Sequence, residues 1–269
     1  MSSTCPRPID WKSCALTHVG AVRDENEDAV IAVPEAQLWA VADGMGGHQV
    51  GDVASKKIIG ALQYLETDQR MSDFVTDVED RLISVNEQLG EYAAVMLDDG
   101  TIGSTVVALL IRDRFGVCAW VGDSRLYRYR NRMLTQLSRD HSQVQEMVAM
   151  GLLSESEAQT HPHGNVITRA VGAEPELYVD LNAFSIYLGD IFLLCSDGLY
   201  NAVSEQDIAQ ILEIRDVDIA AQKLVDKALD NGAPDNVSVI VVRGEPGKFQ
   251  SQAQAEPEHT DILQGQHIG

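Results

Sequence analysis

Residues 104–130, STVVALLIRDRFGVCAWVGDSRLYRYR, decide the fold of this chain. Three strand-like runs follow one another there, at 104–112, 115–121 and 124–130. The first two are rich in apolar and β-branched residues, and such runs bounded by Gly and Asp are typical of buried strands. The links between them are short, Arg112-Asp113-Arg114 and Gly122-Asp123. Links of this length join antiparallel neighbours, so the stretch predicts an antiparallel sheet.

Further strands are predicted on both sides of this stretch, at 11–18, 28–33, 37–42, 178–186, 190–195 and 236–243. Amphipathic helices are predicted at 52–66 and 72–93, and two more, with Ser204 and Asp216 as N-caps, precede the last strand. Helices that come in pairs between antiparallel strands favour layers outside the sheets. We therefore expect an α+β fold, a four-layer α-β-β-α sandwich in which two antiparallel sheets are flanked by helix pairs.

The chain divides into one large domain and two short ends. Residues 1–10 are expected to form a loose leader and 11–243 the domain, while 244–269, rich in Gln, Glu and Gly, are typical of a disordered tail. Within the domain, 142–166 carries two short capped helical segments, which indicates a surface flap beside a site.

Composition narrows the classes of function. The 269 residues are 45% hydrophobic, enough for a sizeable core, and their formal net charge is −21. That charge argues against nucleic-acid binding and against docking on anionic membranes. The chain shows no uninterrupted apolar stretch near about 18 residues, no signal-peptide pattern at its start and no C-x-x-C spacing. We expect a cytoplasmic monomer without a disulfide framework or a zinc site.

Acidic residues recur at the ends of the apolar runs. Asp43, Asp123 and Asp197 each end a run, whereas Glu27-Asp28 and Asp235-Asn236 each lead into one. Carboxylates at strand ends can converge in space although they are far apart in sequence. A cluster of them repels itself unless hard cations lie between, and oxygen ligands suit Mg²⁺ or Mn²⁺. The pattern predicts a carboxylate metal centre with more than one ion.

Two other motif interpretations fail. A calcium loop beginning at Asp24 has Ala29 where the sharp turn needs Gly. The glycine-rich segment 43–47 is followed by neither the Lys-Ser/Thr of a P-loop nor the third Gly of a dinucleotide fingerprint.

The acidic motifs, taken in order, resemble the signature of metal-dependent PP2C-type protein phosphatases, and most closely that of the bacterial members. The resemblance covers about residues 11 to 243 and implies both the α-β-β-α sandwich and hydrolysis of phosphoserine and phosphothreonine in proteins. The matching segments are Arg23-x-x-x-Glu27-Asp28, Val41-Ala42-Asp43-Gly44-Met45-Gly46-Gly47, Gly103-Ser104-Thr105, Gly122-Asp123-Ser124-Arg125, Ser196-Asp197-Gly198 and Asp235-Asn236.

The resemblance also implies roles for individual residues. Asp43 would bridge two Mn²⁺ or Mg²⁺ ions, one completed by Asp197 and Asp235, the other by Glu27 and the Gly44 carbonyl. Asp123, with Asp197, would hold a third, weaker ion. Asp28 and Asn236 would contact the ligands and not the ions, and Asp28 would orient a water that binds an ion. Arg23 would bind the substrate phosphate with its planar donor fork.

The expected reaction is in-line attack on phosphorus by a water or hydroxide that bridges the two ions. The general acid stays unassigned, because Met45 stands where some family members have His. His48, His141 and a metal-bound water all remain open for that role, and a lone His is more often structural.

We therefore expect a Ser/Thr protein phosphatase whose partners are phosphorylated proteins and a bacterial Ser/Thr kinase that it opposes. Two alternatives remain. One is a non-catalytic scaffold of the same fold that binds phosphoproteins, and the other is a di-metal hydrolase of small phosphate esters. The intact set of metal ligands argues against the scaffold, and the flap favours a protein substrate.

Overall fold

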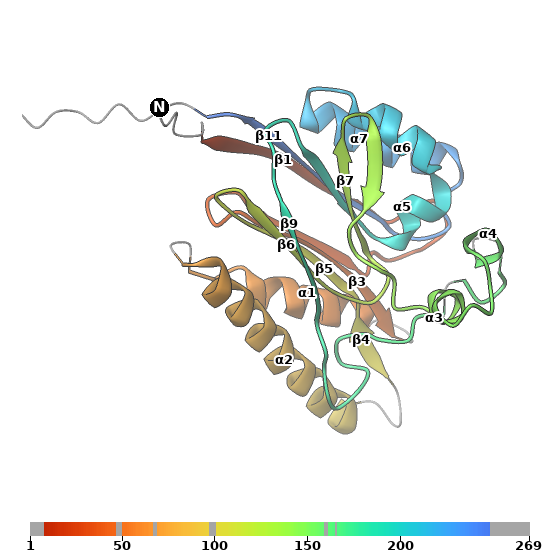
Figure 1. Ribbon diagram of the computed structural model, residues 1–269. Coiled ribbons are helices and arrows are strands. Elements are labelled where there is room, and N and C mark those ends of the chain that lie inside the picture. Colours follow the sequence, from red (N-terminus) through yellow and green to blue (C-terminus); the bar gives the residue numbers. More distant parts are fainter. Residues whose placement is uncertain are drawn as a thin grey trace, which may run out of the picture.

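Two antiparallel sheets lie face to face and helices cover the outer face of each, as the sequence predicts (Figure 1). The computed structural model describes residues 8–46, 50–66, 69–96, 101–158, 161–164 and 166–247. The predicted tail at 244–269 and His48 fall largely or wholly outside these residues. No helix in the described part is long and apolar enough to cross a membrane.

Each sheet is antiparallel throughout. The first has the strand order β1 (Ile9–His18), β11 (Val237–Pro246), β10 (Ile191–Cys195), β7 (Arg125–Arg130) and β8 (Met133–Gln136). The second has the order β2 (Asp28–Val33), β3 (Leu38–Gly46), β5 (Val106–Arg112), β6 (Phe115–Val121) and β9 (Asp180–Ser185), and β4 (Ile102–Ser104) pairs with the end of β3.

The apolar side chains form three cores, because the strands are apolar on both faces. Along β3, Leu38, Ala40 and Ala42 face the helices while Trp39 and Val41 face the other sheet, which is the alternation that a strand imposes. Helices α1 (Gly51–Leu62) and α2 (Met71–Met96) cover the second sheet, and α5 (Asp197–Ala202), α6 (Glu205–Leu212) and α7 (Val217–Asp230) cover the first. The third core fills the space between the sheets.

The predicted N-caps of the later helices are confirmed. The Ser204 hydroxyl accepts the Asp207 N–H, and the Asp216 carboxylate accepts the N–H groups of Asp218 and Ile219. Helix α5 was not expected. Its six residues are too few to show a periodic apolar face, so the outer layer over the first sheet holds three helices where a pair was predicted.

One predicted link is wrong. Arg112-Asp113-Arg114 does join the antiparallel neighbours β5 and β6, but Gly122-Asp123 joins β6 of the second sheet to β7 of the first. Gly122 adopts φ +102°, and a Cβ there would lie 2.6 Å from the Thr105 side chain. Only Gly allows this sharp change of direction, and it places Asp123 where the chain crosses between the sheets.

The domain's first and last strands extend past the expected bounds of 11 and 243. They pair along their whole length, from Ile9↔Pro246 to His18↔Val237. Strand β8 was not predicted either; Asn131 and Arg132, both with positive φ, form the tight turn that leads into it.

The expected flap contains two short capped helices, α3 (Gln143–Ala149) and α4 (Glu155–Ala158), beyond one end of the sandwich (Figure 1). Ser142 caps α3 by accepting the Gln145 N–H. A backbone bridge between Ser142 and Ile167 closes the base of this segment.

Candidate metal centre

A cavity of about 270 Å³ lies where the two sheets meet, at the end that carries the acidic motifs. It brings together residues far apart in the chain, such as Arg23 and Asp235, which are 212 positions apart. All the predicted ligands line it, and so do Arg23 and Asn236; the full lining is Arg23, Glu27, Asp43, Gly44, Met45, Gly46, Thr105, Asp123, Ile167, Asp197, Asp235 and Asn236.

Asp43 and Asp28 face each other across two paired strands. Asp28 begins β2, Asp43 lies near the end of β3, and the two are directly opposite in the ladder. Like charges in such a pair destabilise a sheet. Asp28 is buried; its Oδ2 accepts the Ser196 hydroxyl at 2.8 Å, and its Oδ1 has no hydrogen-bond partner among the described residues. The pair therefore leaves negative charge without a counter-charge.

The backbone around Asp43 is held firmly. The Asp43 N–H donates to the Thr105 hydroxyl at 3.2 Å, and the Asp43 carbonyl accepts both the Thr105 N–H and the Ser104 hydroxyl. Gly44 follows, and a Cβ there would lie 2.1 Å from the Gly51 carbonyl oxygen. A larger residue at position 44 would push the start of α1 away from the cavity.

Asp123 and Asp197 approach from the opposite side. Asp123 is buried at the crossing between the sheets, and its backbone carbonyl accepts the Tyr200 hydroxyl at 3.1 Å. Asp197 is the first residue of α5, directly after β10, and its Oδ2 accepts the Asn201 side-chain amide at 3.1 Å.

Asn236 ties together the loops that carry the remaining residues. Its side-chain amide donates to the carbonyls of Val19 and Glu25, and its Oδ1 accepts the Glu27 N–H at 2.8 Å. Beside it, Asp235 Oδ2 pairs with Arg23 Nη2 at 2.8 Å. Arg23 is half exposed and is the one basic residue among the described residues that line the cavity.

The carboxylates raise one another's pKa values. Burial, followed by the charges of Asp28, Asp197, Asp123 and Asp235, raises the pKa of Asp43 well above its usual range. Burial and its acidic neighbours raise the pKa of Asp197 to about 8 and that of Asp123 to about 6. Burial also raises the pKa of Glu27, although a hydrogen bond from the Gly51 backbone opposes this.

This donor set fits hard divalent cations. Among the described residues it offers carboxylate and backbone oxygens without a thiolate or an imidazole. The raised pKa values and the unpartnered Asp28 Oδ1 record a deficit of positive charge. In the described part of the chain, no three Asp, Glu, His or Cys side chains lie close enough together to hold an ion as they stand. The carboxylates would have to draw together around an ion, with waters completing its coordination.

The structure adds supporting residues to those predicted. Thr105 and Ser196 were not assigned roles, although both lie in the quoted motifs. For Ser196 the available signal was a side-chain oxygen directly before Asp197, whereas Thr105 contacts Asp43 across 62 positions of the chain, which the sequence does not show. None of the described residues that line the cavity is a histidine. His141 is buried behind it, so the general acid stays unassigned.

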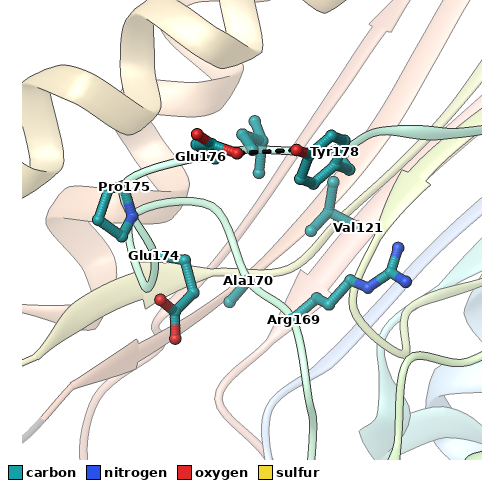
Figure 2. A pocket seen from close by; sticks show the side chains of 8 residues that line it. Val121, Arg169, Ala170, Glu174, Pro175, Glu176 and Tyr178 are labelled. Atoms are coloured by element: carbon teal, nitrogen blue, oxygen red, sulfur yellow. Dashed lines mark hydrogen bonds between the residues drawn. The ribbon is translucent and has the colours of Figure 1, made fainter.

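A second cavity, of about 480 Å³, is larger but lacks the chemistry (Figure 2). Its apolar floor includes Val121 and Ala170, and Glu174 and Glu176 lie on one surface loop with Arg169 at the edge. The Glu176 carboxylate accepts the Tyr178 hydroxyl at 2.8 Å. None of the acidic motifs contributes a carboxylate to it, so the smaller cavity is the candidate site.

Comparison with known proteins points the same way. The family model described as protein phosphatase 2C matches residues 18–231. The serine/threonine protein phosphatase PstP of Mycobacterium tuberculosis is 38% identical over 82% of this chain, but the match spans 43% of PstP, less than half of its length. The serine/threonine phosphatase stp of Listeria monocytogenes is 36% identical, over 84% of this chain and 93% of its own.

Solved structures agree with these matches. PppA, a key regulatory component of T6SS in Pseudomonas aeruginosa, superposes with a TM-score of 0.82 at 39% identity, over 89% of this chain and 100% of its own. The catalytic domain of PstP in complex with two manganese ions gives a TM-score of 0.80 at 34% identity, over 88% of this chain and 99% of its own. With this fold, this cavity and these matches, the chain belongs to the protein phosphatase 2C family.

Proposed function

We propose that this protein hydrolyses phosphoserine and phosphothreonine in proteins with Mn²⁺ or Mg²⁺ and thereby opposes a Ser/Thr kinase. The observation that carries the proposal is the cluster of Glu27, Asp43, Asp123, Asp197 and Asp235 around one cavity with a single Arg at its edge. Bound ions would supply an acidified water and positive charge for the phosphate oxygens, the effects that make phosphate-ester hydrolysis fast.

The residues divide into ligands and supports. Asp43 is central, because the charges of Asp28, Asp123, Asp197 and Asp235 all raise its pKa. Glu27 and the Gly44 carbonyl are proposed ligands on one side of it, and Asp197 and Asp235 on the other. Asp123 is proposed, with Asp197, for a third, weaker ion. Asp28 and Asn236 support the ligands from behind.

Arg23 is proposed to bind the phosphate. It contacts Asp235 at 2.8 Å with one guanidinium nitrogen and stays half exposed at the mouth of the cavity. Its other N–H groups are thus available to phosphate oxygens, and a guanidinium suits such oxygens because it donates in a fork.

A polar cavity beside the flap supports a protein substrate over a small ester. It has a volume of about 630 Å³ and lies between the flap and helices α5 and α6. Ser142, Gln145 and His161 line it from the flap side, and Asn201 and Glu205 from the helix side. Side chains of this kind can hydrogen-bond to the backbone of a peptide on either side of the phosphorylated residue.

The first experiment measures phosphate release from a phosphothreonine peptide and from p-nitrophenyl phosphate, with Mn²⁺, after EDTA, and after Mn²⁺ is restored. We expect metal-dependent release, with kcat/KM higher for the peptide. A folded, metal-loaded protein that binds the peptide without releasing phosphate would instead be a scaffold. A clear preference for the small ester would favour the small-ester hydrolase.

A further inference from the structure

A buried histidine holds the turn that carries Asp123. His141 is 8% exposed and does not line the metal cavity. Its backbone N–H donates to the Gly122 carbonyl at 2.9 Å, and the Gly122 N–H donates to its Nδ1 at 3.1 Å. His141 therefore binds both polar backbone groups of Gly122, the residue directly before Asp123. Its backbone binds the Gly122 carbonyl and its side chain binds the Gly122 N–H.

The imidazole has a defined orientation and tautomer. A backbone N–H can only donate, so Nδ1 must accept and the ring proton must be on Nε2. Nε2 lies 2.9 Å from Asp180 Oδ2, which accepts that proton, and Arg169 Nη1 lies 3.5 Å from the other oxygen of Asp180. The Trp120 ring stacks on the imidazole with 6.1 Å between centroids.

The turn itself has no room to adjust. Gly122 has φ +102° and packs against Thr105, the residue that also accepts the Asp43 N–H. The His141 carbonyl accepts the Thr168 N–H at 2.8 Å, next to the cavity-lining Ile167. His141 thus connects the Asp123 turn to the segment at the base of the flap.

We propose that His141 is a positioning residue of the metal centre, whose Nδ1 bond to Gly122 sets the direction of the Asp123 carboxylate while Asp180 fixes the required tautomer. The inference rests on the proposed function, in which Asp123 holds the weakest of the ions. Residues that orient metal ligands in this way typically change metal affinity or activity by about 10–100-fold when altered.

Two substitutions separate the two ring nitrogens. The Oδ1 of His141→Asn can take the place of Nδ1 and accept the Gly122 N–H, but the side chain loses Asp180. The side-chain amide of His141→Gln can reach Asp180, but leaves no acceptor for the Gly122 N–H at the position of Nδ1. His163→Gln, at an exposed position of the flap, is the matched control.

The readouts are the Mn²⁺ concentration for half-maximal phosphatase activity, the number and affinity of bound Mn²⁺ ions by EPR, and the thermal midpoint. For His141→Gln we expect about tenfold weaker binding of the weakest ion and an equally raised Mn²⁺ requirement. For His141→Asn we expect most of that loss to be recovered, although both variants leave a cavity and lower the midpoint. His163→Gln should match the wild type.

Equal losses of Mn²⁺ affinity in the Asn and Gln variants, or none in either, would overturn the inference, since either result assigns His141 a packing role only. If a variant does not fold, Asp180→Ala against Asp180→Asn gives the same test, because Asn still offers an oxygen to Nε2–H and Ala does not. A wild-type protein without metal-dependent activity would contradict the proposed function instead, and the EPR titration would still test the inference.

Discussion

Two regions of this molecule that hold buried carboxylates differ in their counter-charges. Asp190 is buried at the far end of β10 and makes two 2.6 Å bonds to the Arg130 guanidinium. Among the described residues that line the metal cavity, Arg23 is the one counter-charge for its carboxylates, and burial and mutual repulsion raise the pKa values of Asp43, Asp123 and Asp197. A buried acid with its own Arg stabilises the fold, whereas acids that lack one leave room for a cation from solution.

The largest expected effect is in the metal cavity, where the carboxylates do not each have their own Arg. Asp43→Asn removes the proposed central ligand, so turnover with Mn²⁺ should fall by roughly 1,000-fold, more than the loss typical of residues around a ligand. The same change removes repulsion from the metal-free protein, whose thermal midpoint should rise or stay equal. Phosphate release and thermal melting without metal test both parts, with the exposed Asp73→Asn as control. Full activity in Asp43→Asn would refute the metal assignment.

A substitution in the pair of Asp190 and Arg130 should lower the free energy of unfolding instead of the activity. Asp190→Ala leaves the Arg130 guanidinium without its carboxylate, and breaking such a buried pair costs about 3 kcal/mol. Urea unfolding should show this loss, while kcat per folded molecule stays near that of the wild type. The exposed Asp226→Ala is the control and should change stability by less than about 0.5 kcal/mol. A loss of kcat in Asp190→Ala at constant stability would erase the distinction between the two regions.

Arg23 pairs with Asp235 in the metal cavity, as Arg130 pairs with Asp190 in the other region. Arg23→Ala removes a charge-assisted contact to the phosphate, so kcat/KM should fall about tenfold, mainly through KM. Steady-state kinetics on the phosphothreonine peptide measure this, with Arg70→Ala, a surface pair with Asp73, as control. An unchanged KM would mean that Arg23 serves only Asp235.

The smallest expected effect is a pH dependence of the metal-free protein. An unfolded Asp has a pKa of about 4, whereas burial raises the pKa of Asp123 to about 6 and that of Asp197 to about 8 in the folded protein. Between about pH 4 and pH 8 the folded state thus binds more protons than the unfolded chain, and stability decreases as pH rises through this range.

Thermal melting in EDTA should show the midpoint falling by several degrees from pH 5 to pH 8, and Mn²⁺ should restore it at pH 8 because it binds only the folded state. A midpoint that rises with pH in EDTA would show that the cavity acids are already compensated.

The sequence predicted what depends on local pattern. Apolar runs such as 190–195 give the strands, Ser204 and Asp216 give the helix starts, and an Asp at the end of a run marks the site. Predictions from the sequence were wrong where the structure depends on contacts between residues far apart in the chain. A two-residue link such as Gly122-Asp123 looks like a hairpin until Thr105 and His141 are seen to hold it between sheets.

The same reason limits what could be foreseen in the site. Asp28 lies directly opposite Asp43 because of the register between β2 and β3. Neither stretch of sequence by itself specifies that register. That Asn236 accepts the Glu27 N–H depends on a contact across 209 positions of the chain. The types of residue in the site could be predicted from the sequence, but the contacts that hold them in place could not.

The pairing of the first and last strands has a mechanical consequence. Ile9 and Pro246 lie opposite each other at the same end of the β1–β11 ladder, about 30 Å along the strand from His18 and Val237 beside the metal cavity. A force that pulls Ile9 and Pro246 apart therefore breaks the ladder one hydrogen bond at a time, like a zipper, instead of shearing all of them together. The sandwich should yield at low force from this end, and the rupture would reach the catalytic loops last.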